Sequence, residues 1–241
     1  MKQTIVFALL LMGCASKYQP NIEGVRLLKV EQNSAVLLAA DSLIGPYKQA
    51  LQGAMSEAII YNPKLLQKQQ PESALGNLLA DMVLEAGRAN FGKVDMAMLN
   101  YGGIRSALPA DTLRIGHILE MLPFNNMLQL VEMDSALLTT FVSHWLEKGG
   151  TPLAGVHILA SGKQLKEVRV AGELLSSRRT YRVVMPDYVA NGGDGCGFLS
   201  RALSQQTGTH LISDLVIEAL KAYALQQPQL NARIDGRFLI E

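Results

Sequence analysis

The feature that most constrains the fold is the alternation of short apolar strands with amphipathic helices along the chain. The helical signal is clearest after Ser73, the expected N-cap, where apolar residues recur at i, i+3, i+4 and i+7 from Leu75 to Ala86. A buried strand at Val94–Leu99 follows. No solenoid period, heptad repeat or low-complexity tract is present, so the pattern predicts one α+β or layered α/β domain.

The remaining elements are predicted by the same patterns. Strands are expected at Gly24–Val30, Met55–Tyr61, Thr112–Ile115, Met127–Met133, Val156–Leu159, Leu165–Val170 and Tyr181–Met185. Helices are expected at Ser42–Gln52, over a short stretch ending at Met121, from Ser135 to about Lys148, and from about Ser213 to Leu225. No long linker divides this series of elements.

The N-terminus has the pattern of an export signal. Lys2 supplies a positive charge, Ile5–Met12 is apolar but too short to span a bilayer, and Gly13-Cys14 follows. Residues 11–14 resemble a bacterial lipobox, which predicts a lipoprotein signal peptide at 1–13, a lipidated tether at 14–23 that starts with Cys14, and a domain at 24–241. The alternative is a plain secretory signal cut near Ala15 and Ser16. The first reading places the protein in the cell envelope, at the outer membrane or the periplasmic face.

Composition excludes two further classes of protein. Apart from Cys14, Cys196 is the only cysteine, so the predicted domain at 24–241 can form no internal disulfide and must rely on its core. The 22 Lys and Arg residues nearly balance the 21 Asp and Glu residues, and no basic run occurs. Non-specific nucleic-acid binding is therefore not expected.

Three segments combine backbone freedom with functional side chains: 100–105, 123–126 and 188–195. Phe124 and Tyr188 stand in loops rich in Gly, Asn and Pro, and could hold a flat ring between them. Asn126 and Asp194 could bind polar edges or sugar hydroxyls, and Arg105 could bind an anion. Each residue taken singly also has an ordinary structural explanation, such as a core cap, a turn or a surface ion pair.

Taken together, these segments resemble the C-terminal domain of the 5′-nucleotidase and UDP-sugar hydrolase family. The resemblance covers Glu72–Asp81, the Asn-x-Gly-Gly-Ile-Arg motif at 100–105, the Pro-Phe-x-Asn motif at 123–126, and the tyrosine strand and Gly-Gly-Asp-Gly loop at 181–195. It implies a layered α/β/β/α-type α+β fold that binds the nucleoside part of the substrate. Two aromatic rings sandwich the base in that family.

The resemblance assigns a role to each matching position. It implies substrate binding by Asn100, Gly102, Gly103, Arg105, Phe124, Asn126, Tyr188, Gly192, Gly193 and Asp194. Tyr188 stands where Phe is common and can still stack, while Asp194 matches the aspartate that contacts ribose hydroxyls. Family arginines near the start of the first long helix have no counterpart, because 64–70 contains Lys64 and Lys68 but no Arg.

Hydrolysis in the family is carried out by a separate metallophosphatase domain that binds two metals. His117, His144, His157 and His210 occur in neither an Asp-x-His nor a Gly-Asn-His-Glu motif, and no Gly-x-Ser-x-Gly elbow is present. We therefore expect no catalytic residue, metal or other cofactor on this chain, with divalent metals on a partner metallophosphatase. The chain is predicted to be the nucleotide-binding half of a split 5′-nucleotidase, not catalytic alone. The alternative is a lipoprotein that binds nucleosides or nucleotides without hydrolysing them.

Overall fold

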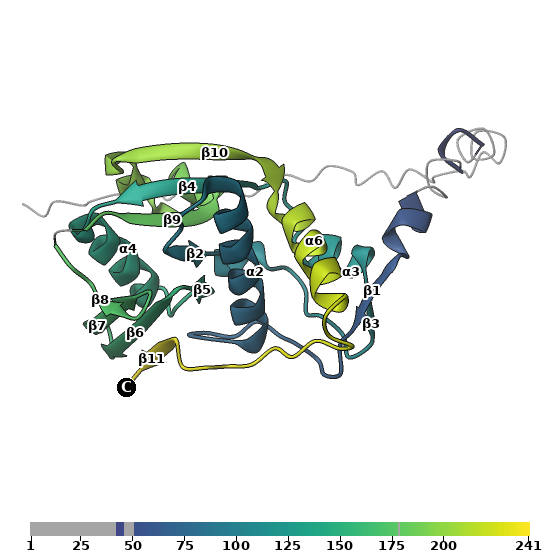
Figure 1. Ribbon diagram of the computed structural model, residues 1–241, viewed down its shortest axis with the longest axis horizontal. Helices are drawn as coiled ribbons and strands as arrows, with labels where there is room; N and C mark the ends of the chain where they lie inside the picture. The colour runs from purple at the N-terminus through teal and green to yellow at the C-terminus, as the bar shows by residue number, and fades with distance from the viewer. Residues whose placement is uncertain (1–41, 46–50, 178) are drawn as a thin grey trace, which may run out of the picture. The chain divides into compact units, whose positions relative to one another are not determined.

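The computed structural model describes residues 42–45, 51–177 and 179–241 (Figure 1). It divides into two compact units, Met1–Gly45 and Pro46–Glu241, and the labelled helices and strands belong to the second. The predicted signal peptide, Cys14, the tether and the strand at Gly24–Val30 lie outside the described residues. The helix predicted at Ser42–Gln52 falls only partly within them, and residues 42–45 and 51–52 are helical.

The second unit mixes helices and strands throughout, which confirms the predicted α+β class. Its helices are α2 (Ala74–Phe91), α3 (Ile115–Met121), α4 (Ser135–Glu147), α5 (Asp187–Ala190) and α6 (Ile212–Ala224), with 3-10 turns η1 (Tyr101–Gly103), η2 (Gly193–Gly195) and η3 (Gly197–Arg201). Its strands are β1 (Ala58–Tyr61), β2 (Met96–Met98), β3 (Thr112–Arg114), β4 (Met127–Met133), β5 (Leu153–Ala154), β6 (Val156–Ser161), β7 (Gln164–Val170), β8 (Glu173–Leu174), β9 (Tyr181–Pro186), β10 (Ser204–Leu211) and β11 (Phe238–Ile240).

The largest sheet has five strands in the order β10-β4-β9-β2-β5. Strands β2 and β9 run parallel, with Met96 opposite Val183, whereas β4 runs antiparallel to β9, with Leu128 opposite Pro186. The carboxyl ends of β2 and β9 therefore meet the amino end of β4 at one edge of the sheet. Each of the three motif segments is attached to one of these strand ends.

Both faces of this sheet are buried, which explains why its inner strands are apolar at nearly every position. Ala97, Leu130 and Val184 belong to a core that contains helices α2, α3 and α6. Met98, Val131 and Val183 belong to a second core, formed with helix α4 and strands β6 and β7 (Figure 1). Successive strand residues enter opposite cores because side chains alternate across a sheet.

Local signals place several element boundaries where they were predicted. The Ser73 hydroxyl accepts a hydrogen bond from the Gly76 amide at 3.0 Å and caps α2. Strand β4 has the predicted bounds, and α4 begins at the predicted Ser135, after an Asp134 N-cap whose carboxylate accepts from the Leu137 amide at 2.7 Å. In these segments the short-range pattern and the tertiary packing favour the same conformation.

One predicted strand begins later than expected, and strands β5, β8, β10 and β11 were not predicted. Residues 51–55 are helical, so the strand predicted from Met55 begins only at Ala58. Strand β10 was not predicted, because its sequence, Ser-Gln-Gln-Thr-Gly-Thr-His-Leu, has no apolar alternation. It forms the edge of the five-stranded sheet, paired with β4 on one side, and most of its side chains are exposed. A strand without a buried face carries no hydrophobic pattern to detect.

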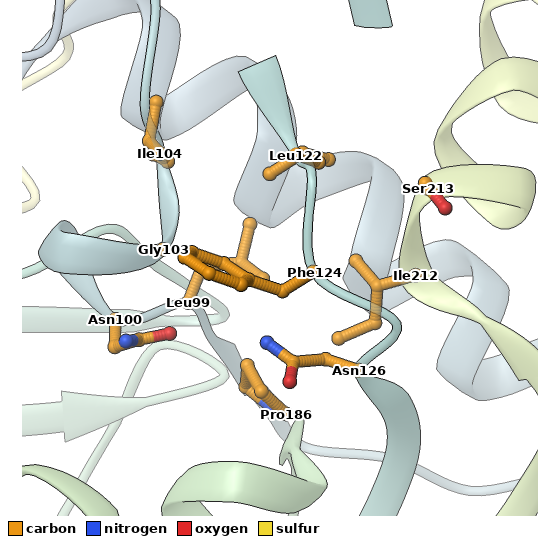
Figure 2. A pocket seen from close by; sticks show the side chains of 10 residues that line it. All are labelled: Leu99, Asn100, Gly103, Ile104, Leu122, Phe124, Asn126, Pro186, Ile212 and Ser213. Carbon is orange, nitrogen blue, oxygen red and sulfur yellow. The ribbon is translucent and has the colours of Figure 1, made fainter. Parts of the chain in front are cut away.

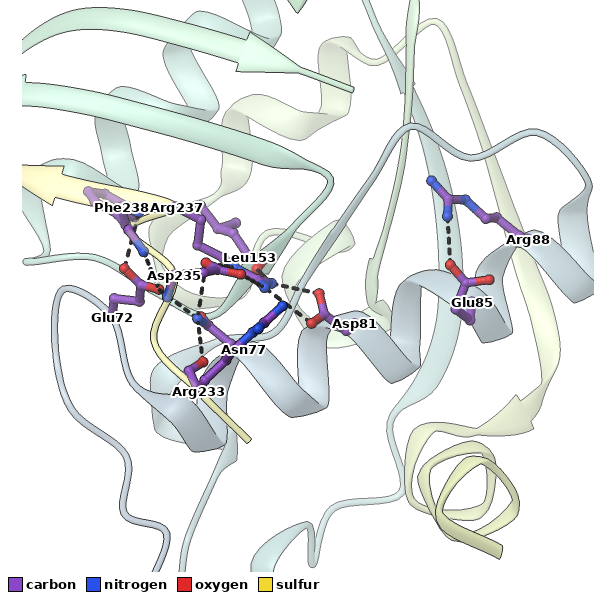
Figure 3. A network of polar contacts seen from close by, with 11 residues as sticks. Glu72, Asn77, Asp81, Glu85, Arg88, Leu153, Arg233, Asp235, Arg237 and Phe238 are labelled. Carbon is purple, nitrogen blue, oxygen red and sulfur yellow. Dashed lines mark hydrogen bonds and ion pairs between the residues drawn. The ribbon is translucent and has the colours of Figure 1, made fainter. Parts of the chain in front are cut away.

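A polar network joins the C-terminal segment to helix α2 (Figure 3). The Arg237 guanidinium, on a residue only 8% exposed, donates to both carboxylate oxygens of Asp81 at 2.6 and 3.1 Å. It also donates to both oxygens of Asp235, at 2.8 and 2.6 Å, and to the Leu153 carbonyl at 3.0 Å. The Glu72 carboxylate accepts from the side chain of Asn77 and from the Asp235 and Gly236 amides. The segment before β11 is therefore held by charge-assisted hydrogen bonds.

We expect Arg237→Ala to lower the free energy of unfolding by about 2–3 kcal/mol, because it removes hydrogen bonds between charged groups around a buried guanidinium. Arg88→Ala is the matched control, since the Arg88–Glu85 pair is exposed and the Arg88 contact with the Val94 carbonyl is long, at 3.3 Å, so the loss should be at most about 1 kcal/mol. Urea unfolding of both variants measures the difference. Equal losses would show that the network does not hold this segment.

None of the described helices is both long and apolar enough to cross a membrane.

Candidate functional site

The three motif segments meet at the edge of the sheet where β2, β4 and β9 present their ends. They enclose a pocket of about 370 Å³. Seven of the ten predicted site residues line it: Asn100, Gly102, Arg105, Phe124, Asn126, Tyr188 and Asp194. Gly103 lines an adjoining hollow of about 20 Å³, and Gly192 and Gly193 form the turn that carries Asp194. The structure therefore brings together residues separated by almost a hundred positions in the chain.

The first segment leaves β2 and turns through η1. The Gly103 amide donates to the Asn100 carbonyl at 2.9 Å, and a Cβ at Gly103 would lie 2.8 Å from Asn100 Oδ1, so a larger residue here would displace the Asn100 side chain. The Arg105 amide donates to the Met121 carbonyl at 2.8 Å, which ties the loop to the end of α3. The Arg105 guanidinium then lies 5.9 Å from the centre of the Phe124 ring.

Lys68 supports this loop from outside the pocket. Its ammonium donates to the carbonyls of Tyr101 at 3.2 Å and Ile104 at 2.6 Å, and lies 4.3 Å from the centre of the Tyr101 ring. Burial and the nearby charge of Arg105 lower the pKa of Lys68 below its ordinary value. Lys68 was not among the predicted site residues, because a lysine in a polar connector carries no signal of a contact made more than thirty residues away.

Two aromatic rings border the pocket. Phe124 is 48% exposed and Tyr188 is 47% exposed, so both rings present accessible surface at the pocket. The Asn126 carbonyl accepts from the Ile212 amide at 2.9 Å, so the start of α6 holds the second segment in place. Figure 2 shows the side chains of Asn100 and Asn126 directed toward each other beside the Phe124 ring. The pocket therefore offers exposed ring faces next to amide groups.

Asp194 is held by side chains from three parts of the chain. Its backbone has φ 53° and ψ 25°, a left-handed conformation that non-glycine residues seldom adopt. Asn100 Nδ2 donates to Oδ2 at 3.0 Å, and the Tyr188 hydroxyl donates to Oδ1 at 3.2 Å. His144 Nε2 lies 3.0 Å from the Asp194 carbonyl oxygen, to which its Nε2-protonated form donates. These contacts orient the carboxylate toward the pocket that it lines.

His144 is a second residue whose position at the site was not predicted. It projects from α4, and its ring packs edge-on against Phe198 and Trp145.

Burial and then the negative charge of Asp194 raise the pKa of the neighbouring Cys196 thiol to about 11. Cys196 is therefore a protonated packing residue at neutral pH. Within residues 42–45, 51–177 and 179–241, no three His, Cys, Asp or Glu side chains form a potential metal site.

Comparison with known proteins identifies the family. Residues 52–201 match the model of the 5′-nucleotidase, C-terminal domain. This chain belongs to that family. The matched residues include all three motif segments of the pocket. The resemblance to the 5′-nucleotidase C-terminal domain, which those segments indicated, is therefore confirmed.

Individual relatives of this 5′-nucleotidase C-terminal domain are distant in sequence. The trifunctional nucleotide phosphoesterase protein YfkN of Bacillus subtilis is 23% identical over 92% of this chain and 17% of its own length. A 5′-nucleotidase of Vibrio cholerae is 22% identical over 79% of this chain and 35% of its own length. The chain thus spans about a third or less of these two relatives.

Solved structures confirm the predicted fold. The 5′-nucleotidase precursor of Thermus thermophilus superimposes with a TM-score of 0.71 at 24% identity, covering 85% of this chain and 43% of that one. The NAD nucleotidase of Haemophilus influenzae superimposes with a TM-score of 0.66 at 18% identity, covering 84% and 41%. At these identities the similarity establishes the fold alone, and the ligand-binding roles of the pocket residues stay predictions.

We expect Gly193→Ala, in the Gly-Gly-Asp-Gly loop, to lower the free energy of unfolding by about 1–3 kcal/mol. The new Cβ would lie 2.6 Å from two atoms of the Tyr188 ring and force the ring aside. Gly197→Ala is the matched control, since its Cβ would meet open space and should change stability by at most about 0.5 kcal/mol. Urea denaturation compares the two. A Gly193→Ala protein as stable as Gly197→Ala would contradict this packing.

Proposed function

We propose that this domain binds a nucleotide, with the base held between the rings of Phe124 and Tyr188. The observation that carries the proposal is the presence of these two half-exposed rings on a single pocket in a chain that is only 6% aromatic. Stacking of a base on an aromatic side chain contributes about 1–3 kcal/mol. The pocket volume of about 370 Å³ is within the range of sites for small molecules.

The polar groups around the rings suit the other parts of a nucleotide. Asn126 offers a donor and an acceptor for the edge of the base, and Asp194 offers acceptors for sugar hydroxyls. Arg105 offers a guanidinium for the phosphate. The glycines at 102, 103, 192 and 193 let the backbone approach the ligand closely.

Hydrolysis is, in this proposal, carried out by a metallophosphatase on a separate exported protein, with the divalent metals bound there. The sequence has neither an Asp-x-His nor a Gly-Asn-His-Glu motif. The domain is the substrate-binding half of a split envelope 5′-nucleotidase, anchored by a lipid on Cys14. A binding protein without any hydrolytic partner is the competing function.

The aromatic pair is tested by calorimetry with adenosine and AMP. We expect Phe124→Ala to weaken binding of both by about 1–3 kcal/mol, roughly 5- to 150-fold, through loss of one stacking face. Tyr61→Ala is the matched control, because Tyr61 is 49% exposed on β1 and does not line the pocket. Equal affinity of the Phe124→Ala and wild-type proteins would refute the sandwich.

The split enzyme is tested by phosphate release from AMP in the presence of divalent metal. We measure this chain alone, the candidate metallophosphatase alone, and both together. We expect release to be fastest in the mixture, because this domain supplies substrate binding that the isolated catalytic domain lacks. Equal rates with and without this chain would exclude the split enzyme and favour the binding protein.

A further inference from the structure

The Tyr188 hydroxyl makes two hydrogen bonds, and both are to Asp194. It donates to Asp194 Oδ1 at 3.2 Å and accepts from the Asp194 amide at 3.3 Å. A Cβ on Gly193 would lie 2.5 Å from the Tyr188 carbonyl oxygen and 2.6 Å from its ring atoms, so the ring packs directly on the turn that precedes Asp194. The Tyr188 hydroxyl therefore binds both the side-chain carboxylate and the main-chain amide of Asp194.

The Asp194 carboxylate retains acceptor capacity after these contacts. Each carboxylate oxygen can accept about two hydrogen bonds. The Tyr188 hydroxyl uses one site on Oδ1, and Asn100 Nδ2 uses one site on Oδ2. One site on each oxygen is left for a ligand in the pocket that Asp194 lines. Two adjacent acceptors on a fixed carboxylate complement two adjacent hydroxyl donors.

The two contacts hold the two carboxylate oxygens separately, Asn100 at Oδ2 and Tyr188 at Oδ1. Asn100 is only 6% exposed and comes from the end of β2, whereas Tyr188 belongs to α5, which follows β9. His144 fixes the carbonyl of the same residue from α4. Removing the Tyr188 hydroxyl would remove its hydrogen bonds to Asp194 Oδ1 and from the Asp194 amide. The aromatic ring itself would remain.

We infer that the Tyr188 hydroxyl is a positioning group that fixes the Asp194 carboxylate for a ligand with two neighbouring hydroxyls, such as the cis-diol of ribose. The inference rests on the proposed function, since it concerns the sugar of the same ligand. Tyr188 then has two separable roles: its ring stacks on the base, and its hydroxyl sets selectivity for the sugar through Asp194. A phenylalanine at this position performs only the first role.

The test is calorimetry of the full chain with adenosine and with 2′,3′-dideoxyadenosine. Wild-type protein is expected to bind adenosine more tightly, because the dideoxy compound lacks both hydroxyls. Tyr188→Phe is expected to reduce this preference by about 5- to 10-fold while affinity for dideoxyadenosine changes less than about twofold, since the ring is retained. Tyr223→Phe, on α6 and outside the pocket lining, is the matched control and should keep the wild-type preference.

Asp194→Asn provides an independent measure of the carboxylate contribution and is expected to reduce the same preference. A Tyr188→Phe protein with the wild-type preference, or one that loses affinity equally for both ligands, would overturn the inference and leave the proposed function intact. Absence of binding of either ligand to the wild-type protein would instead overturn the proposed function, and the inference with it. Thermal unfolding of each variant verifies that it is folded at the temperature of the titration.

Discussion

The site depends on the pairing of three strands at the centre of the main sheet. Because β2 and β9 are parallel and β4 is antiparallel to β9, two strand ends and one strand start lie at the same edge. Each carries one motif segment, so this pairing brings Asn100, Asn126 and Tyr188 to one pocket. A slip of one residue in β9 would exchange its inward and outward side chains and displace the third segment from the other two.

Burial on both faces makes this register specific. One core includes residues of α2, α3 and α6, and the other includes residues of α4 and of strands β6 and β7. Helices from both sides also contribute directly to the site, since the Ile212 amide at the start of α6 holds Asn126, and His144 on α4 holds Asp194. The polar pocket is thus supported by two apolar cores that exclude alternative pairings of the strands.

The pocket combines a rigid backbone with exposed side chains. Asp194 keeps a left-handed conformation, which is unfavourable for a residue with a Cβ, and the hydrogen bonds from Asn100, Tyr188 and His144 stabilise it. Phe124 and Tyr188 remain half-exposed on the same pocket. A carboxylate oriented before the ligand arrives lowers the entropic cost of binding. The same arrangement accounts for the separate roles proposed for the ring and the hydroxyl of Tyr188.

The sequence by itself determined the elements whose signals are local. Ser73 and the apolar repeat after it specified α2, and the bounds of β4 followed from its apolar run. Two Gly-Gly motifs and one Pro-Phe-x-Asn motif identified the three site segments. Tertiary structure alone decided the other features. Strand β10 exists because β4 pairs with it, although its exposed polar residues carry no pattern, and Lys68 and His144 reach the site from 36 and 50 residues away in sequence. Periodicity and capping act within a few residues, whereas strand pairing and side-chain contacts between distant segments form only when the whole chain is folded.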